Sequence, residues 1–119
     1  ITVGTNNITK ATSFYDEVFS FVGATKEHNY ERFVGWSSQG QMFAVVTPFD
    51  GNQASVGNGT MIALKVDTQD IVDRVHAKVI ELGGVCEGPP GIRQQNYYCG
   101  YCRDLDGNKL NFYCKLQMP

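Results

Sequence analysis

Apolar side chains recur along the chain with two different spacings, one typical of helices and one typical of strands. In residues 9–21 they are three or four positions apart, which places them on one stripe of a helix. They are Ala11, Phe14, Tyr15, Val18 and Phe21. Asn7 is suited to cap this helix and Gly23 to end it. Strand-like runs lie around the helix, at 1–5, 25–28, 32–36 and 41–47. This part of the chain therefore predicts the order β-α-β-β-β.

The second part of the chain repeats this order. A helical stripe covers 68–82 and is followed by Gly83-Gly84. Strand-like runs lie at 61–66, 85–87, 97–103 and 109–114. Superposing Ile1 on Ile62 also brings Gly23 onto Gly84. The repeat predicts module 1 at about 1–48 and module 2 at about 60–119. The linker at 49–59 is rich in Gly, Asn, Ser and Gln.

One such module cannot cover both faces of a four-stranded sheet, so two modules are expected to pair. The predicted fold is α+β: a curved, eight-stranded mixed sheet around a cleft, with the helices on its outer face. The alternative is a generic α+β domain in which the repeat is accidental.

Alternation along the strands predicts which side chains face the cleft. Leu110, Phe112 and Cys114 form an apolar set that we expect beneath the helix. The intervening set, which includes Asn111, is mixed, and so is the set of Met61, Ala63 and Lys65 in the 61–66 run. We expect the mixed sets to line the concave side, where a ligand would bind.

Composition narrows the possible partners. The 119 residues are enough for one domain, 1–119, with a core of its own. A formal net charge of −2 gives no electrostatic footprint for nucleic acid or an anionic membrane. No apolar run approaches the roughly 18 residues that a membrane span needs. We therefore expect neither nucleic acid nor membrane as a partner.

The four cysteines do not form a recognisable redox or zinc motif. They are Cys86, Cys99, Cys102 and Cys114. Cys99 and Cys102 have C-x-x-C spacing, but their tyrosine-rich surroundings predict a strand, on which residues three apart point to opposite faces. We expect reduced thiols, many of them buried, and hence an intracellular, cytoplasmic protein.

Several short segments, in their order and spacing, resemble the glyoxalase/bleomycin-resistance/dioxygenase superfamily, also called the vicinal oxygen chelate fold. The resemblance covers essentially the whole chain and includes residues 14–18 of the first predicted helix. Its other segments are 48–51, 57–60, 83–93 and 103–108, the last containing Asp-Leu-Asp-Gly-Asn. None of these segments is specific alone, since Asp-x-Asp-Gly is simply a favourable turn.

The resemblance implies a divalent metal in the cleft, held by His and Glu side chains of the first and last strands of each module. Carried over to this chain, the first-strand His falls just before Ile1 and the fourth-strand position falls at Ala44. The fifth-strand His falls at Met61 and the last-strand Glu at Asn111. A thioether and a neutral amide are poor ligands for such metals. We therefore expect no metal site, no metal cofactor and no identifiable catalytic residue, with a divalent metal as the alternative.

Other candidate residues carry weaker signals. Arg93, predicted on a loop after Pro89-Pro90-Gly91, would hold a carboxylate or phosphate or simply face solvent. Tyr101 matches a face that contributes a tyrosine to the cavity in fosfomycin-resistance relatives, or it is a packing residue. His28 and His76 are expected at the surface or in packing, and Trp36 and Met42 in the core or a dimer contact. Glu87 is a conceivable base without a visible partner.

Two functions fit these observations. The first is a metal-free binding protein whose cleft holds a small apolar or aromatic molecule through Met61, Ala63, Arg93, Tyr101 and Asn111. The second is an enzyme: a metal-dependent lyase or dioxygenase, or an acid/base catalyst without metal. A homodimer is expected in either case, since superfamily members of this size commonly dimerise. Its expected contact is the apolar segment 42–49 with the linker through Gly59.

Overall fold

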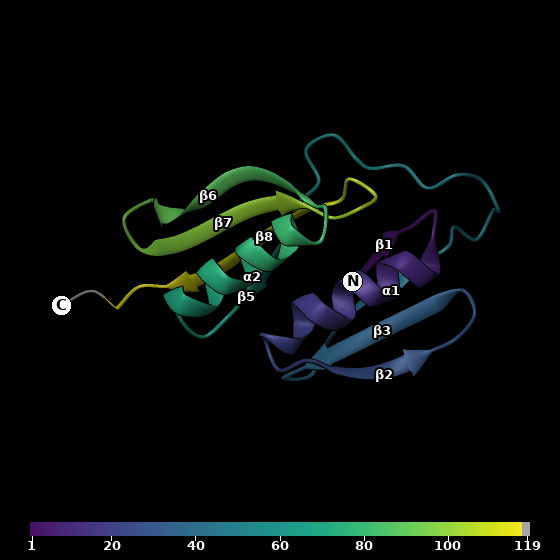
Figure 1. The fold of residues 1–119 in the computed structure, drawn as a ribbon, viewed down its shortest axis with the longest axis horizontal. Coiled ribbons are helices and arrows are strands. Elements are labelled where there is room, and N and C mark those ends of the chain that lie inside the picture. The colour runs from purple at the N-terminus through teal and green to yellow at the C-terminus, as the bar shows by residue number, and fades with distance from the viewer. Residues whose placement is uncertain (118–119) are drawn as a thin grey trace.

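The computed structural model describes residues 1–117, and its first half contains the first predicted module. Strand β1 (Thr2–Gly4) leads into helix α1 (Ile8–Ser20). Strands β2 (Thr25–Asn29), β3 (Phe33–Ser38) and β4 (Gln41–Val46) follow. The strands form a sheet in the order β1-β4-β3-β2, in which only the β1–β4 pair is parallel. Figure 1 shows α1 lying across this sheet.

The second half has the same topology. Strand β5 (Ile62–Lys65) precedes helix α2 (Gln69–Glu81). Strands β6 (Val85–Arg93), β7 (Tyr97–Arg103) and β8 (Lys109–Lys115) complete a sheet of order β5-β8-β7-β6. The predicted α+β fold with two β-α-β-β-β modules is confirmed. Hydrogen bonding divides its eight strands into two four-stranded sheets, because β1 and β5 each pair with only one described strand.

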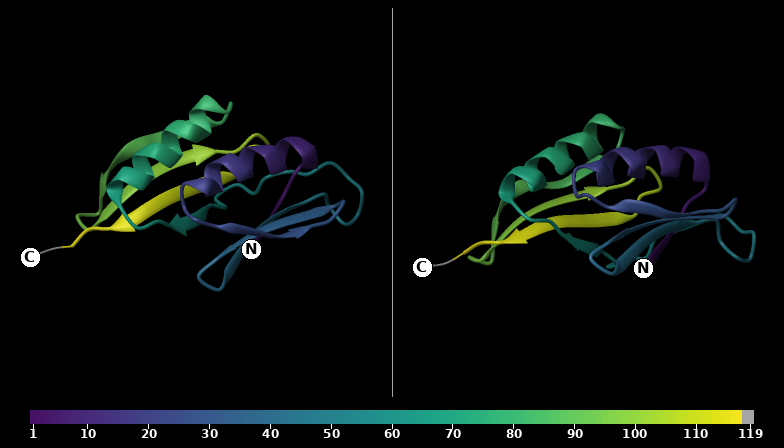
Figure 2. Two further views of the ribbon diagram at one scale, coloured as in Figure 1. Left: turned by 60° about the horizontal axis from the view of Figure 1, so that its bottom comes forward. Right: turned by 90° about the horizontal axis from the view of Figure 1, so that it is seen from below.

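Both helices lie on the same side of the sheets, as the two views of Figure 2 show. Side-chain caps start them: Asn7 accepts a hydrogen bond from the amide of Lys10, and Thr68 accepts one from the amide of Ile71. The cap predicted at Asn7 is confirmed. Within residues 1–117, neither helix is long and apolar enough to cross a membrane.

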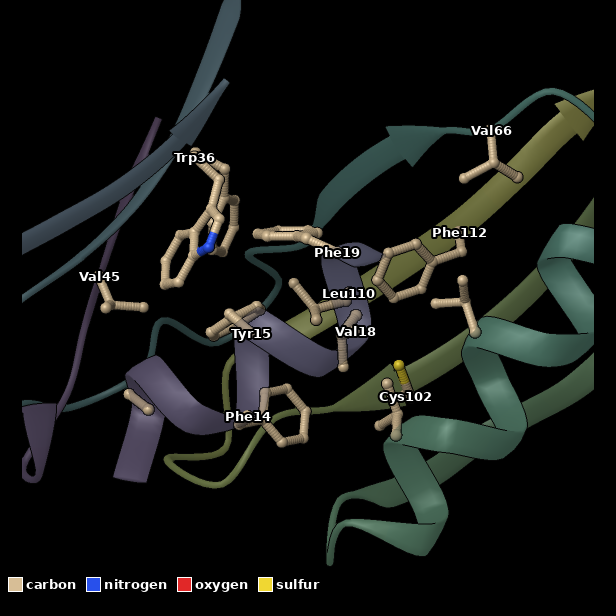
Figure 3. Packing of buried hydrophobic residues seen from close by; sticks show 14 of the residues in the cluster. Phe14, Tyr15, Val18, Phe19, Trp36, Val45, Val66, Cys102, Leu110 and Phe112 are labelled. Atoms are coloured by element: carbon tan, nitrogen blue, oxygen red, sulfur yellow. The ribbon is translucent and has the colours of Figure 1, made fainter. Parts of the chain in front are cut away.

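Aromatic side chains of α1 and the first sheet pack together at one end of the core (Figure 3). The ring of Tyr15 lies 4.9 Å from that of Phe43 and 5.8 Å from that of Trp36, between centroids. Phe112 and Leu110 of β8 continue the same buried cluster into the second module, where they meet α2. The apolar strand faces therefore pack beneath the helices, as predicted.

The turn between β7 and β8 joins the two modules. The Tyr15 hydroxyl of α1 donates a 2.6 Å hydrogen bond to Asp104, and Asn108 Nδ2 donates to the Gly4 carbonyl at 3.0 Å. The Asn6 amide donates to Asp106 Oδ1 at 2.9 Å. Gly107 has a φ of +90°, which a side chain would disfavour. The Asp-Leu-Asp-Gly-Asn segment thus has a structural role.

Strand β6 differs from the prediction. The sequence predicted a strand only at 85–87 and a loop after it, whereas β6 continues through Pro89 and Pro90 to Arg93. Proline has no amide donor and is tolerated on an edge strand, and β6 is the outermost strand of its sheet. Its register with β7 shifts between Cys86 and Gly88 and again before Gly91. The loop position predicted for Arg93 is therefore wrong.

Part of the predicted dimer contact is not at the surface. Phe43, Ala44 and Val45 of β4 are buried within the chain. Phe49, at the end of the predicted segment, is 97% exposed. Met42 and residues 46–48 are half-buried, so Phe49 and the segment after it are the most accessible part of the predicted contact.

Candidate functional site

The second sheet has one face covered by α2 and one that the helices leave open. On β7 and β8 the side chains of Cys102, Leu110 and Phe112 belong to the core beneath the helices. Because strand side chains alternate, Tyr101 and Asn111 lie on the opposite side. We call this second side the open face of module 2. It includes Ala63, Arg93, Cys99, Tyr101, Lys109 and Asn111.

Asn111 lies at the centre of the open face. It is directly opposite Tyr101 of β7 on one side and Ala63 of β5 on the other. Its side chain is only 7% exposed, and its Oδ1 has no hydrogen-bond partner among residues 1–117. A buried carbonyl oxygen without a donor costs about 1–3 kcal/mol relative to a satisfied one. Oδ1 is enclosed by protein atoms, so a ligand reaches it only when the Asn111 amide turns about χ2. A bound N–H or O–H group would then satisfy this acceptor.

The ring of Tyr101 lies next to Gly88 of β6, and the guanidinium of Arg93 lies next to Gly91. A Cβ atom at Gly88 would come within 3.0 Å of its ring, and one at Gly91 within 2.6 Å of the Arg93 guanidinium. The absence of side chains at these two positions therefore leaves room for both groups. Burial first, and then the Cys99 thiol, raise the pKa of Tyr101 above its ordinary value, while Arg93 opposes this. The hydroxyl is thus a neutral donor near pH 7.

Two cations flank the same ring. Arg93 Cζ lies 5.7 Å and Lys109 Nζ 5.8 Å from the Tyr101 centroid, within the range of cation–π attraction. The Arg93 guanidinium also donates to the carbonyl of Pro89 at 2.9 Å. The hairpin of β6 and β7 thereby holds this charge beside Tyr101, in the position that the sequence assigned to a loop.

A third cation nearby is already neutralised. Arg103 forms an ion pair with Glu87, and this contact holds the pKa of the Glu87 carboxyl below its usual value, with Lys109 adding a smaller effect. Glu87 is therefore a carboxylate bound to an arginine, and this environment does not favour its role as a general base.

The residues at the superfamily's metal positions do not fit a divalent metal. Ala44 has no donor atom and is fully buried, while Met61 offers a thioether and Asn111 a single neutral amide oxygen. Among residues 1–117, no three His, Cys, Asp or Glu side chains are grouped so as to hold a metal ion. These residues therefore do not support chemistry at a bound metal.

The structure brings most of the predicted ligand-binding residues onto one face. Ala63, Tyr101 and Asn111 are cross-strand neighbours, and Arg93 lies over the ring of Tyr101. Met61 precedes β5 and is 39% exposed.

The side chains of the two histidines and the tryptophan are not part of the open face. His76 is buried on α2, with Nε2 3.2 Å from the Tyr101 carbonyl oxygen. The ring of His28 lies next to Tyr30 and Phe33. Trp36 is in the core, where its indole N–H donates to Asp16. The predicted packing roles of His76 and Trp36 are confirmed.

A separate cavity of about 520 Å³ lies between the modules. It is bounded by the end of α1, the β3–β4 hairpin and β5. Of the five predicted ligand-binding residues, all of which the structure describes, only Ala63 lines it. This cavity is a second place at which a small molecule would fit.

Sequence reasoning did not propose Lys109 or Cys99 for the site. Alternation on β8 puts Lys109 on the same side as Asn111, but nothing in the sequence indicates that its ammonium group reaches Tyr101 on the next strand. Cys99 points to the open face and Cys102 to the core, as the strand prediction for the C-x-x-C segment requires.

Comparison with solved structures gives close matches over nearly the whole chain. A glyoxalase/bleomycin resistance protein from Albidiferax ferrireducens T118 is 32% identical, with a TM-score of 0.89 and coverage of 95% of this chain and 93% of that one. A glyoxalase-related enzyme from Fulvimarina pelagi is 20% identical, with a TM-score of 0.76 and coverage of 96% and 84%. A lactoylglutathione lyase from Agrobacterium tumefaciens is 18% identical, with a TM-score of 0.70 and coverage of 96% and 90%. The last two show similarity of fold alone.

No protein-family model matches the sequence. The comparison with curated proteins finds no significant match either. The family assignment therefore depends on the A. ferrireducens protein, whose identity and coverage extend over both modules. Together with the paired β-α-β-β-β topology, this relationship shows that the chain belongs to the glyoxalase/bleomycin-resistance/dioxygenase superfamily.

Proposed function

We propose that the protein binds a small apolar or aromatic molecule on the open face of module 2, without a metal. The observation that carries the proposal is the buried, unpaired Oδ1 of Asn111 beside the ring of Tyr101. An aromatic ring next to an acceptor without a donor is suited to a ligand that stacks and donates one hydrogen bond. Ala63 and Met61 supply apolar surface at the β5 side of this site.

The alternative is a metal-dependent lyase or dioxygenase. The Agrobacterium relative is named for a lyase and others for dioxygenases, but their identities to this chain are below 25%. The donor atoms at Ala44, Met61 and Asn111 favour binding over such catalysis. The predicted cytoplasmic location rests on the free thiols of the four cysteines.

The test is to titrate the protein with small aromatic molecules and to measure the changes in its amide chemical shifts by NMR. We expect the largest changes at Tyr101 and Asn111, which do not line the inter-module cavity. Changes confined to the inter-module cavity, for example at Val22 and Gln41, would assign binding to that cavity and contradict the proposal. Elemental analysis of protein purified without chelators supplies the second test. About one bound metal per chain would contradict a metal-free site.

A further inference from the structure

The open face of module 2 carries positive charge that its surroundings do not balance. Lys109 and Arg93 lie within 6 Å of the Tyr101 ring centroid. Among residues 1–117, neither has a carboxylate within 4 Å, whereas Arg103 is paired with Glu87. The whole chain has a formal charge of −2. The two cations are therefore a local feature and do not reflect a generally basic protein.

Neither cation is freely mobile in solvent. Both are half-buried, and Arg93 is fixed by two backbone carbonyls and the Tyr101 ring. Its guanidinium has five donors, so N–H groups remain for a ligand. A guanidinium that is held in place loses little conformational entropy when it binds an anion. A fixed, unpaired guanidinium beside an aromatic ring, with a second cation nearby, provides the chemistry to bind a carboxylate or phosphoryl group.

The second observation comes from Asn111, whose unpaired Oδ1 accepts a hydrogen bond only from an N–H or O–H group. Asn111 is directly across from Tyr101, so their Cβ atoms are about 5 Å apart. An anion held by Arg93, which reaches the ring from β6, and a donor placed at Asn111 on β8 would thus be on either side of Tyr101. This separation suits the two ends of one small aromatic molecule.

On the basis of the function proposed above, we propose that the ligand is an aromatic anion that carries a hydroxyl or amine donor. Its carboxylate or phosphoryl group binds Arg93, its ring packs against Tyr101 with Ala63 at the edge, and its donor binds Asn111 Oδ1. Lys109, which approaches the Tyr101 ring from β8, adds a longer-range attraction for the anion. The anion and the donor are recognised by different residues, so they can be tested separately.

The probe is 4-hydroxybenzoate, compared with benzoate, phenol and 4-hydroxybenzamide, each titrated into the intact protein by calorimetry or NMR. We expect 4-hydroxybenzoate to bind most tightly. Benzoate lacks the donor, and the two neutral molecules lack the charge. Arg93→Gln should weaken 4-hydroxybenzoate binding about ten-fold, the usual effect of losing a charged hydrogen bond, and leave phenol binding unchanged. Lys109→Gln should weaken it less, because only a longer-range attraction is lost. Raising the salt concentration should weaken only the anions.

Lys10→Gln is the matched control. Lys10 is exposed on α1 of module 1, so this substitution removes one positive charge outside the open face of module 2. Asn111→Leu should abolish the preference for 4-hydroxybenzoate over benzoate while both still bind. Equal affinity for neutral and anionic probes, with shifts at Tyr101 that Arg93→Gln does not alter, would overturn the anion assignment but retain aromatic binding. No binding by any of the four probes would overturn both proposals.

Discussion

Tyr15 connects the first helix to the second module through one buried hydrogen bond. Its hydroxyl donates to Asp104 Oδ2 at 2.6 Å, and both side chains are at most 5% exposed. Asp104 also accepts from the Asp106 and Asn108 amides and from Asn108 Nδ2. The carboxylate therefore keeps most of its partners if the hydroxyl is removed.

Tyr15→Phe should lower the free energy of unfolding by about 1–3 kcal/mol, since a buried charged acceptor loses one donor. Urea denaturation measures the change. Tyr98→Phe is the control: its hydroxyl donates to Asp73 at 2.6 Å at the surface, where water replaces a lost partner, so the cost should be smaller. Equal losses in the two variants would contradict a special role for the Tyr15 contact.

The same contact predicts a pH dependence. Burial, and then the charge of Asp104, raise the pKa of Tyr15 well above its ordinary value. In the unfolded chain tyrosine titrates near pH 10, so above this pH the unfolded state loses the proton first and is favoured. The stability that Tyr15 contributes should therefore be complete below about pH 10 and be lost as the pH rises further. Burial also raises the pKa of Cys102, to about 12. This thiol therefore adds a further loss of stability at alkaline pH, which is the same in the unmodified protein and in the Tyr15→Phe variant. Tyr15→Phe should show the shallower alkaline decline, and identical slopes would contradict this.

Met61 and Asn111 allow a direct test of two of the metal positions that the family resemblance implies. Met61→His with Asn111→Glu places an imidazole just before β5, two residues from Ala63, and a carboxylate on β8 opposite Ala63. The double variant should bind Ni²⁺ or Mn²⁺ more tightly than either single variant, measured by calorimetry. The single variants are the controls. A titration that stays flat for the double variant would mean that the two positions do not converge.

Individual site residues were predictable only as far as strand alternation extends. Alternation places Asn111 and Tyr101 on one face, and the structure brings them together. It does not reveal that Oδ1 of Asn111 lacks a partner or that Lys109 reaches the Tyr101 ring, since both facts depend on side chains from several strands. Contacts between side chains that are distant in the sequence cannot be predicted from the local pattern of one strand.

At the scale of elements, the helices were more predictable than the β6 strand. The apolar stripe and Asn7 cap define α1 within one residue of its observed bounds, because helix signals are local. Pro89 and Pro90 signal a break, yet β6 continues because it is an edge strand that bulges around them. Edge position is a property of the sheet and has no local signature in the sequence.

The start of α2 gives a test at this scale. The Thr68 side chain accepts a hydrogen bond from the Ile71 amide at 3.2 Å, and no other side chain of the described residues caps this end. Thr68→Ala should lower the free energy of unfolding by about 1 kcal/mol, measured by thermal or urea denaturation. Thr68→Ser retains the acceptor and should have little effect. A Ser variant as unstable as the Ala variant would show that the methyl group, and not the cap, matters.

At the scale of the whole molecule, the arrangement leaves surfaces that a second copy would cover. β1 and β5 each have one edge without a described partner strand. Phe49 is 97% exposed and Val56 45% exposed, in the segment between β4 and β5 that also carries the predicted contact. Unpaired strand edges and large exposed apolar side chains both favour association.

A homodimer is therefore the expected state in solution, with a symmetric interface above about 1,000 Å² that includes Phe49. Light scattering at micromolar concentration should give twice the 13.2 kDa mass of the chain. Phe49→Asp should shift the protein toward monomer, because it would place a charge in an apolar contact. Val85→Asp is the control, since Val85 is a 57% exposed apolar residue in the other module. A mass near 13.2 kDa for the unmodified protein would contradict the dimer. The open face of module 2 would then have to bind its ligand within one chain.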